Sequence, residues 1–272
     1  MSALQKIKTT AHRVLRKVGL ESKPSRADAP AQTLLAEFEA IPGETIRMRT
    51  CFPSMAQGTH DEFLYEALKK RNLPLAGATV WDVGAHFGYH TLRFAALSGT
   101  SGRVIAFEPN PHNLQMLREN LDLNPHLSGR IQIVDCAVAD SDGTQTLRCS
   151  DDDSISDIGF LQKSGQPANR VRQASYDRLR DVSVYTRSLD SLVHQGIAKP
   201  QIIKIDVEGA EALVLEGATE VLQWRKASLL IEIHNISCMF SCLQTLATFG
   251  YRNELLDDGP RSPSRGFIMC RP

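Results

Sequence analysis

The sequence lacks an excess of either charge, a paired cysteine motif and a long apolar run. Its 272 residues include 31 Lys and Arg against 31 Asp and Glu, so we expect no global positive field that would draw it to nucleic acid. None of the six cysteines stands in the C-x-x-C spacing of a zinc or redox site. No apolar run reaches the roughly 20 residues of a membrane-spanning helix. These absences favour a cytoplasmic protein with reduced thiols.

The first segment of the chain is basic and differs from the rest. Residues 1–20 carry five Lys and Arg residues and no acid, and their apolar residues recur at helical spacing. Residues 1–32 are therefore predicted to be a basic amphipathic helix and a linker, followed by one folded body over 33–272. A docked or solvated helix is the favoured interpretation. Peripheral contact of residues 1–20 with a membrane, or targeting to an organelle, are the alternatives.

From Ala78 onward, short β-branched runs alternate with longer helical patterns, which indicates a parallel sheet covered by helices. The pattern is interrupted over 141–187 by short polar and alternating segments that suggest hairpins, and the chain ends in a further hairpin. The expected strands lie at 79–84, 102–110, 130–140, 200–209 and 227–235, and the expected helices at 89–99, 111–125, 210–223 and 240–250.

Acidic residues follow nearly every one of these strands. In an open α/β sheet the ligand binds outside the carboxyl ends of the strands. An unpaired buried carboxylate is costly, so we expect a ligand there with hydroxyls, amines or positive charge. The residues at these ends are Asp82, Gly84, Glu108, Asp135, Asp206, Glu208, Glu232 and His234.

The stretch "VWDVGAHFGYHTL" places two glycines, Gly84 and Gly88, where a strand turns into a helix. Glycine permits positive φ and close approach of a ligand to the backbone. A nicotinamide dinucleotide is one candidate, because Glu108, twenty residues after Gly88, suits ribose hydroxyls. However, the spacing is not G-x-G-x-x-G, and Asp82 would oppose a pyrophosphate. S-adenosylmethionine, which has no phosphate, fits better. A turn that only packs the helix on the strand is the third interpretation.

Four segments resemble the FkbM family of S-adenosylmethionine-dependent methyltransferases. They are "DVGAHFGYHT", "FEPNPHN", "RSLDSL" and "IKIDVEGAEALVLEGA", and the resemblance runs from about Asp61 to Tyr251. It implies an α/β class I methyltransferase (Rossmann-like) fold, with a doubly wound, mostly parallel seven-stranded sheet and a β-rich insertion. It also implies methylation of hydroxyl groups, often on sugars or polyketides. His86 stands where members commonly carry Asn, and Ser188 where they commonly carry Thr.

The cofactor roles follow from this arrangement. Backbone groups around Gly84 and His86 are expected near the methionine part, with Asp82 ordering the turn or the ammonium group. Glu108 can accept both ribose hydroxyls, and 135–137 can lie beside the adenine. An ordinary capping or solvated acid is an equally good interpretation of Asp135. The residues expected to bind the cofactor are Asp82, Gly84, His86, Gly88, Glu108, Asp135, Ala137 and Asp206.

Methyl transfer to an alcohol requires alignment and removal of a proton. Asp206 or His234 is expected to be the base. The alternative is a divalent metal ion held by Asp206, Glu208, Glu232 and His234, and the metal-free version is favoured. Residues 141–187 are expected to form a cap that selects a small-molecule or glycan acceptor. The competing functions are a cofactor-binding module without catalysis and methylation of a macromolecule.

Overall fold

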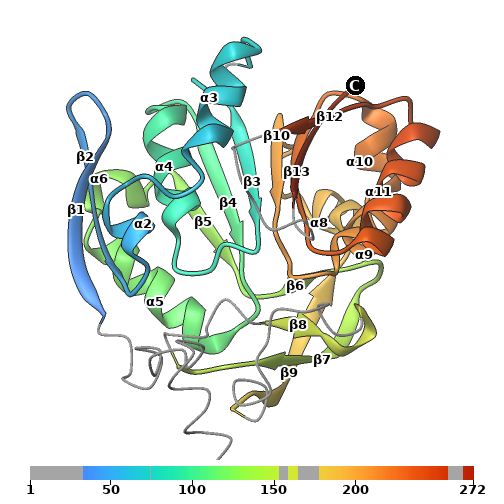
Figure 1. Ribbon diagram of the computed structural model, residues 1–272, viewed down its shortest axis with the longest axis horizontal. Coiled ribbons are helices and arrows are strands. Elements are labelled where there is room, and N and C mark those ends of the chain that lie inside the picture. Colours follow the sequence, from blue (N-terminus) through green and yellow to red (C-terminus); the bar gives the residue numbers. More distant parts are fainter. Residues whose placement is uncertain (1–32, 74, 153–158, 165–177, 257–265) are drawn as a thin grey trace, which may run out of the picture. The chain divides into compact units, whose positions relative to one another are not determined.

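The computed structural model describes residues 33–73, 75–152, 159–164, 178–256 and 266–272. The predicted N-terminal helix and linker, the middle of the insertion and the tip of the terminal hairpin lie outside these residues. Within them the chain forms three sheets, of seven, four and two strands (Figure 1). No helix in these ranges combines the length and apolarity needed to cross a bilayer.

The seven-stranded sheet has the strand order β12-β13-β11-β10-β3-β4-β5. All its pairs are parallel except those of β13 with β11 and β12, so the predicted doubly wound, mostly parallel sheet is confirmed. The chain runs outward from β3 to β5 and returns at β10, which puts the switch point between β3 and β10. The strands are β3 (Thr79–Val83), β4 (Arg103–Phe107), β5 (Ile131–Val134), β10 (Ile202–Ile205), β11 (Ser228–Ile233), β12 (Arg252–Leu256) and β13 (Gly266–Arg271).

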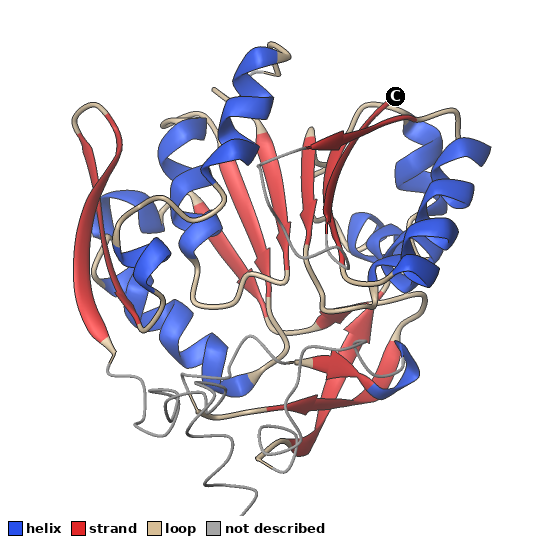
Figure 2. Cartoon of the chain, in the orientation of Figure 1, coloured by secondary structure: helices blue, strands red, loops and turns tan. Residues whose placement is uncertain are grey.

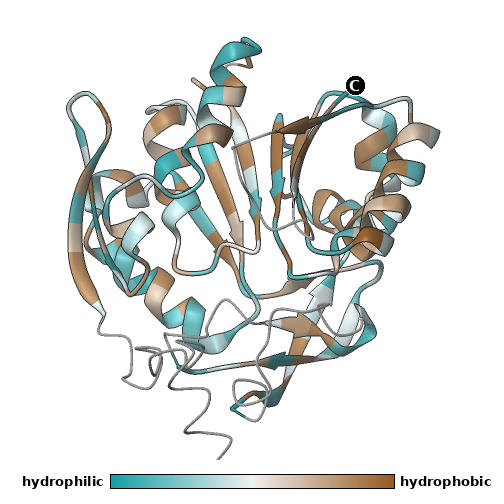
Figure 3. Cartoon of the chain, in the orientation of Figure 1, coloured by the Kyte–Doolittle hydropathy of each residue, from teal (hydrophilic) through white to brown (hydrophobic). Residues whose placement is uncertain are grey.

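Helices cover both faces of this sheet (Figure 2). Because successive side chains of a strand point to opposite faces, Val80 belongs to one apolar core and Trp81 to the other. Hydrophobic residues accordingly dominate the central strands (Figure 3). The core around Val80 includes residues of α2 (Pro53–Ala56), α3 (Glu62–Lys70), α4 (Tyr89–Ser98), α5 (Pro111–Asp122) and α6 (Pro125–Ser128). The core around Trp81 includes residues of α8 (Leu189–His194), α9 (Glu211–Glu216), α10 (Thr219–Trp224) and α11 (Ile236–Thr248).

Two predicted elements are each divided in the structure. The strand expected at 130–140 is β5 followed by β6 (Ala137–Val138), which belongs to the four-stranded sheet. The helix expected at 210–223 is interrupted between α9 and α10 at Gly217. A Cβ at Gly217 would lie 2.2 Å from the carbonyl oxygen of Ala139, so the chain passes too closely there for a larger residue.

The predicted β-rich insertion is confirmed as a sheet of order β6-β9-β7-β8. Its apolar side chains, including Leu147, Leu161 and Val184, pack with Ala137 and Ala210. Since Ala137 follows β5 and Ala210 follows β10, this packing holds the insertion at the carboxyl ends of the central strands. Its elements after β6 are β7 (Gly143–Cys149), β8 (Phe160–Leu161), η3 (Gln162–Ser164) and β9 (Arg180–Arg187).

An N-terminal hairpin, β1 (Leu34–Ile41) and β2 (Glu44–Thr50), was not predicted. Two asparagine side chains of the α5–α6 region bond its outer backbone. Asn124 accepts from Arg47 N at 2.9 Å and donates to Arg47 O at 2.6 Å. Asn120 does the same with Arg49 at 2.6 and 3.1 Å, and also donates to Phe87 O at 2.8 Å. The hairpin is therefore tied to both α5 and the glycine turn.

Candidate active-site cleft

A cleft opens at the carboxyl ends of the central strands, at the switch point of the sheet. Its walls come from the segments that follow β3, β4, β5 and β10, with Leu147 and Leu161 of the insertion. The cleft and its open mouth together comprise about 1150 Å³ of empty space, part of which is open solvent.

The glycine turn brings the backbones after β3 and β10 together. Gly84 has φ +83°, and a Cβ there would lie 1.8 Å from the carbonyl oxygen of Asp206. Any side chain at Gly84 would thus displace the strand end that carries Asp206. Gly88 has φ +87° and begins α4, where a Cβ would lie 2.4 Å from Leu117 Cδ1. Gly84 shapes the cleft, while Gly88 allows α4 to pack against α5.

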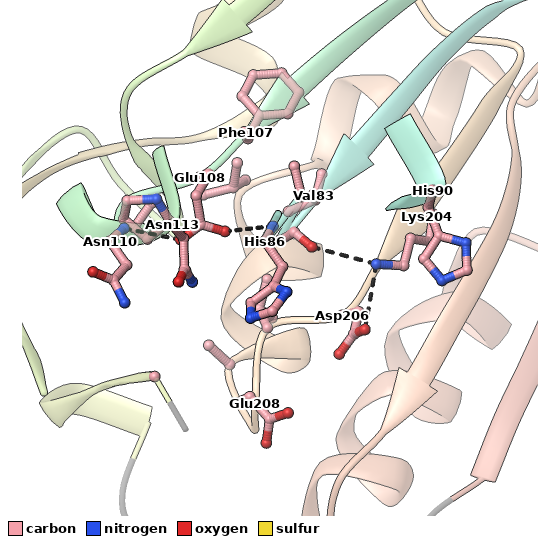
Figure 4. Close-up of a pocket in the computed structure, with 18 of the residues that line it drawn as sticks. Val83, His86, His90, Phe107, Glu108, Asn110, Asn113, Lys204, Asp206 and Glu208 are labelled. Atoms are coloured by element: carbon pink, nitrogen blue, oxygen red, sulfur yellow. Dashed lines mark hydrogen bonds and ion pairs between the residues drawn. The ribbon is translucent and has the colours of Figure 1, made fainter. Parts of the chain in front are cut away.

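Glu108 is held at the end of β4 by bonds to both of its carboxylate oxygens. Oε2 accepts from His86 N at 2.7 Å, and Oε1 accepts from Asn110 N at 2.9 Å and Asn113 Nδ2 at 3.4 Å (Figure 4). Burial raises the pKa of Glu108 to about 7, although the bonds from Asn110 and His86 oppose the shift. Oε2 keeps one acceptor site. The bond from Asn113 to Oε1 is long, at 3.4 Å, so a ligand hydroxyl that replaced Asn113 would allow the two oxygens to accept from two neighbouring hydroxyls.

The segment after β5 gives the cleft an apolar wall. Cys136, Ala137 and Val138 all line it, and Ala137 is buried. Asp135 does not line the cleft; its side chain is 62% exposed and lies 3.9 Å from Arg118. The segment therefore presents three buried, largely apolar side chains to the cleft.

A buried lysine, which sequence reasoning missed, links the two central strand ends. Lys204 lies opposite Asp82 in the β3–β10 register, and its Nζ is 3.5 Å from Asp82 Oδ1 and 3.3 Å from Asp206 Oδ2. Nζ also donates to Gly84 O at 3.3 Å (Figure 4). Burial disfavours the charged ammonium, but Asp206 and Asp82 together raise the pKa of Lys204.

Asp82 lies beneath the cleft and does not line it. It is fully buried, and Oδ2 accepts from Thr91 Oγ1 of α4 at 2.6 Å. Asp206, with a side chain 21% exposed, lines the cleft. Asp82, Lys204 and Asp206 therefore form a row of charged side chains that runs from the interior of the sheet to the cleft. Lys204 and Asp206 line the cleft, whereas Asp82 does not.

His234 follows β11 and is surrounded by carboxylates. Its Nδ1 bonds buried Glu211 at 2.7 Å, and its Nε2 lies 3.3 Å from Glu208, 3.6 Å from Asp206 and 3.8 Å from Glu232. Burial alone would lower the pKa of His234, but Glu208 and Glu211 raise it well above its ordinary value. Burial opposes ionisation of Glu211, yet the bond to His234 lowers its pKa. Neither His234 nor Glu232 lines the cleft, whereas Glu208 and Asp206 do.

Sequence reasoning also missed Asn113, His60 and His90, which line the cleft. Asn113 belongs to the "FEPNPHN" stretch, and its spacing of five residues from Glu108 on a helix start was an available signal. His60 and His90 converge from separate segments, so no local pattern joins them. For Lys204, a charge in the middle of the apolar strand "IIKI" was the signal, because a strand buried on both faces must pair any charge it carries.

A family model described as "Methyltransferase FkbM domain" matches residues 82–255, which is more than half of the chain. The chain belongs to the FkbM methyltransferase family. The family match begins at Asp82, just before the glycine turn, and includes Glu108, Lys204 and Asp206. Cleft residues that precede Asp82 in the sequence, such as His60, lie outside the family match.

Two curated relatives are similar over part of their length. Hexuronic acid methyltransferase AglP of Haloferax volcanii is 35% identical over 157 residues, covering 57% of this chain and 55% of the relative. The 2-O-methyltransferase NoeI of Sinorhizobium fredii is 30% identical over 146 residues, covering 53% and 58%. The chain thus spans little more than half the length of these relatives. A solved FkbM methyltransferase from Methylobacillus flagellatus is 20% identical with a TM-score of 0.49, covering 71% of this chain and 43% of its own.

Proposed function

We propose that the chain is an S-adenosylmethionine-dependent methyltransferase that methylates a hydroxyl group of a sugar, a glycan or a similar small natural product. The observation that carries the proposal is the pairing of a glycine turn with Glu108 at neighbouring strand ends. Both backbone donors to Glu108 come from the turn and the next loop, so its carboxylate is fixed in position before a ligand arrives.

The residues fit this cofactor in three places. Glu108 would accept the two ribose hydroxyls, and the 136–138 wall would hold the adenine. The backbone of Gly84 and His86 would lie beside the methionine part, with Asp82 acting beneath the turn through Thr91 and Lys204. When bound, S-adenosylmethionine supplies a methyl group on a positively charged sulfur.

Asp206 is our candidate for the general base. It lines the cleft, and two cationic groups, Lys204 and His234, fix its carboxylate from behind. Asp206 would accept the proton of the acceptor hydroxyl. The oxygen of that hydroxyl would take the methyl group as the methyl–sulfur bond breaks, so that S-adenosylhomocysteine is left. His234 is better suited to positioning Asp206 than to accepting a proton itself, because its raised pKa favours the protonated ring.

The same contacts argue against a metal ion at the Asp206, Glu208, Glu232 and His234 group. The ammonium of Lys204 already lies 3.3 Å from Asp206. The neighbouring carboxylates raise the pKa of His234 well above its ordinary value, which favours a protonated ring with no lone pair left for a metal ion. We therefore retain the metal-free version at this position.

The insertion, 141–187, is our candidate for the acceptor cap, since Leu147 and Leu161 reach the cleft. The two relatives, a hexuronic acid methyltransferase and a 2-O-methyltransferase, support a sugar hydroxyl as the acceptor. The balanced charge of the chain gives no support to a nucleic acid acceptor. No disulfide joins any of the six cysteines, all of which lie in the described ranges, which supports a reducing, cytoplasmic setting.

The test is an acceptor screen with methyl-labelled cofactor, a panel of neutral sugars and uronic acids, and location of the label on the product. We expect Asp206→Asn to reduce turnover by roughly 10²-fold or more, with S-adenosylhomocysteine affinity little changed. Asp122→Asn, an exposed acid at the end of α5, is the matched control and should be fully active. Cofactor binding without any labelled product across broad panels would favour the binding-module alternative. Loss of cofactor binding in Asp206→Asn would give Asp206 a purely positional role.

A further inference from the structure

Two histidines and an aspartate converge beside the cleft, outside the residues used for methyl transfer above. His60 and Asp61 lie between α2 and α3, and His90 lies in the first turn of α4. His60 Nε2 and His90 Nε2 are each 3.5 Å from Asp61 Oδ2. Both histidines line the cleft, as does Lys204, and His90 is labelled in Figure 4.

The opposite nitrogen of each ring is held by a hydroxyl group. His60 Nδ1 is 3.0 Å from Ser54 Oγ, and His90 Nδ1 is 2.7 Å from Tyr65 Oη. Metal-binding histidines commonly engage their second ring nitrogen in this way, which fixes the ring orientation. Here both outer bonds orient Nε2 toward the same carboxylate.

The spacing within the group is that of ligands around an ion. Hydrogen bonds between nitrogen and oxygen are mostly about 2.7–3.2 Å long, shorter than the 3.5 Å seen for both Nε2–Oδ2 pairs. Two atoms that each lie about 2.1 Å from a tetrahedral ion are separated by roughly 3.4 Å. One potential ligand atom from each residue lies within 4.8 Å of the other two.

Asp61 gives a second indication of a metal site, because its side chain does not cap the helix that it precedes. It is the N-cap residue of α3, where an aspartate usually accepts a bond from the first turn. Its side chain makes no such capping bond. Instead, with φ at 47°, the backbone turns the carboxylate toward the two imidazoles.

We propose that His60 Nε2, His90 Nε2 and the Asp61 carboxylate bind one divalent ion of the zinc type, with its remaining coordination positions directed to the cleft. Two imidazoles and one carboxylate suit zinc and neighbouring transition metals. They are a poor set for magnesium or calcium, which prefer oxygen ligands. The proposal concerns binding, and it stands whether or not the chain transfers methyl groups.

The test uses the full chain after chelator treatment and dialysis. Zn²⁺ titration by calorimetry should give one site, and Co²⁺ should give the visible absorption of a four- or five-coordinate nitrogen and oxygen site. We expect His60→Ala and Asp61→Asn to weaken binding at least tenfold. Ser54→Ala, which removes only an outer bond, should weaken it by about 10-fold to 100-fold. The exposed His194, bonded to Glu220, gives the control His194→Ala, with unchanged affinity.

Thermal unfolding would establish that each variant is folded, and Ser54→Ala provides a mild change should the ligand variants be unstable. Equal Zn²⁺ affinity in the wild type and a folded His60→Ala variant would overturn the proposal. So would loss of the site in Asp206→Asn alone, which would move the ion to the neighbouring acidic group. Intense near-ultraviolet absorption of the Co²⁺ form would indicate thiolate ligands and would equally refute it.

Discussion

The buried carboxyl group of Glu108 should make cofactor affinity depend on pH near neutrality. Its pKa is raised by burial to about 7, and the ribose hydroxyls need an acceptor that is ionised. With a pKa near 7, the ionised fraction falls from about 0.9 at pH 8 to about 0.1 at pH 6. S-adenosylhomocysteine should therefore bind about tenfold more weakly at pH 6 than at pH 8. The ring of His86, whose pKa burial lowers to about 3, stays neutral throughout this range.

The raised pKa of Glu108 also makes the stability of the free protein depend on pH. The ordinary pKa is 4.5 and the folded value is about 7, so the folded state keeps a proton that the unfolded chain releases. The stabilising contribution of Glu108 to the free energy of unfolding is fully present below about pH 4.5. As the pH rises from about 4.5 to about 7, this contribution is lost and the free energy of unfolding falls by up to about 3 kcal/mol. Chemical denaturation of the free protein between pH 5 and 8 would measure the slope.

Glu108→Gln is the informative variant, because it keeps the shape and removes the titration. Both carboxylate oxygens of Glu108 accept bonds from backbone N–H groups. In Glu108→Gln, the NH₂ group of the amide would face one of these N–H donors, which would lose its acceptor and weaken the site. We expect lower affinity, by at least tenfold, with no dependence on pH between 6 and 8. Calorimetry at three pH values would decide. A flat wild-type profile, or the same slope in Glu108→Gln, would refute the reasoning.

Three further predictions concern stability and the N-terminal segment. Gly84→Ala should lower the melting temperature by many degrees, because its Cβ would lie 1.8 Å from a carbonyl oxygen. The control Gly129→Ala, whose Cβ would have nothing within 4 Å, should leave the melting temperature unchanged. Equal melting temperatures for the two variants would contradict the close approach at Gly84. Glu211→Gln should reduce the free energy of unfolding by about 3 kcal/mol in denaturant titrations, since it removes the charge that pairs with buried His234. An unchanged value would mean that the other carboxylates near His234 stabilise its charge without Glu211. Deletion of residues 1–30 should leave cofactor affinity and melting temperature unchanged, and a large drop would indicate a docked helix. Loss of sedimentation with anionic vesicles on that deletion would support the membrane-surface interpretation.

The central sheet could be predicted because its strands are buried on both faces and separated by amphipathic helices. The pattern located β3, β4, β10 and β11 from short apolar runs alone. It could not divide 130–140, because β5 and β6 have similar apolar residues and differ only in which sheet they join. The N-terminal hairpin was missed for a related reason. Its outer backbone is bonded by Asn120 and Asn124, more than seventy residues away in the sequence.

The residues of the candidate site could be predicted where an acidic residue directly follows a strand. Glu108 and Asp206 each follow a strand directly, and both line the cleft. Burial and charge partners could not be read in the same way. His234 and Asp135 both stood at strand ends, yet one is enclosed by acids and the other is solvated. The pairing of Lys204 with Asp82 depends on the register of two strands far apart in sequence.

The asparagine contacts to β2 also bear on how the protein avoids self-association. A strand at the border of a sheet offers a row of unsatisfied backbone groups that can recruit a strand from another chain. On β2, the outward N–H and C=O groups of Arg47 and Arg49 are already taken by the amides of Asn124 and Asn120. Each amide takes the place of one residue of a neighbouring strand, so strand addition at these two positions of β2 would first have to break the bonds to Asn120 and Asn124.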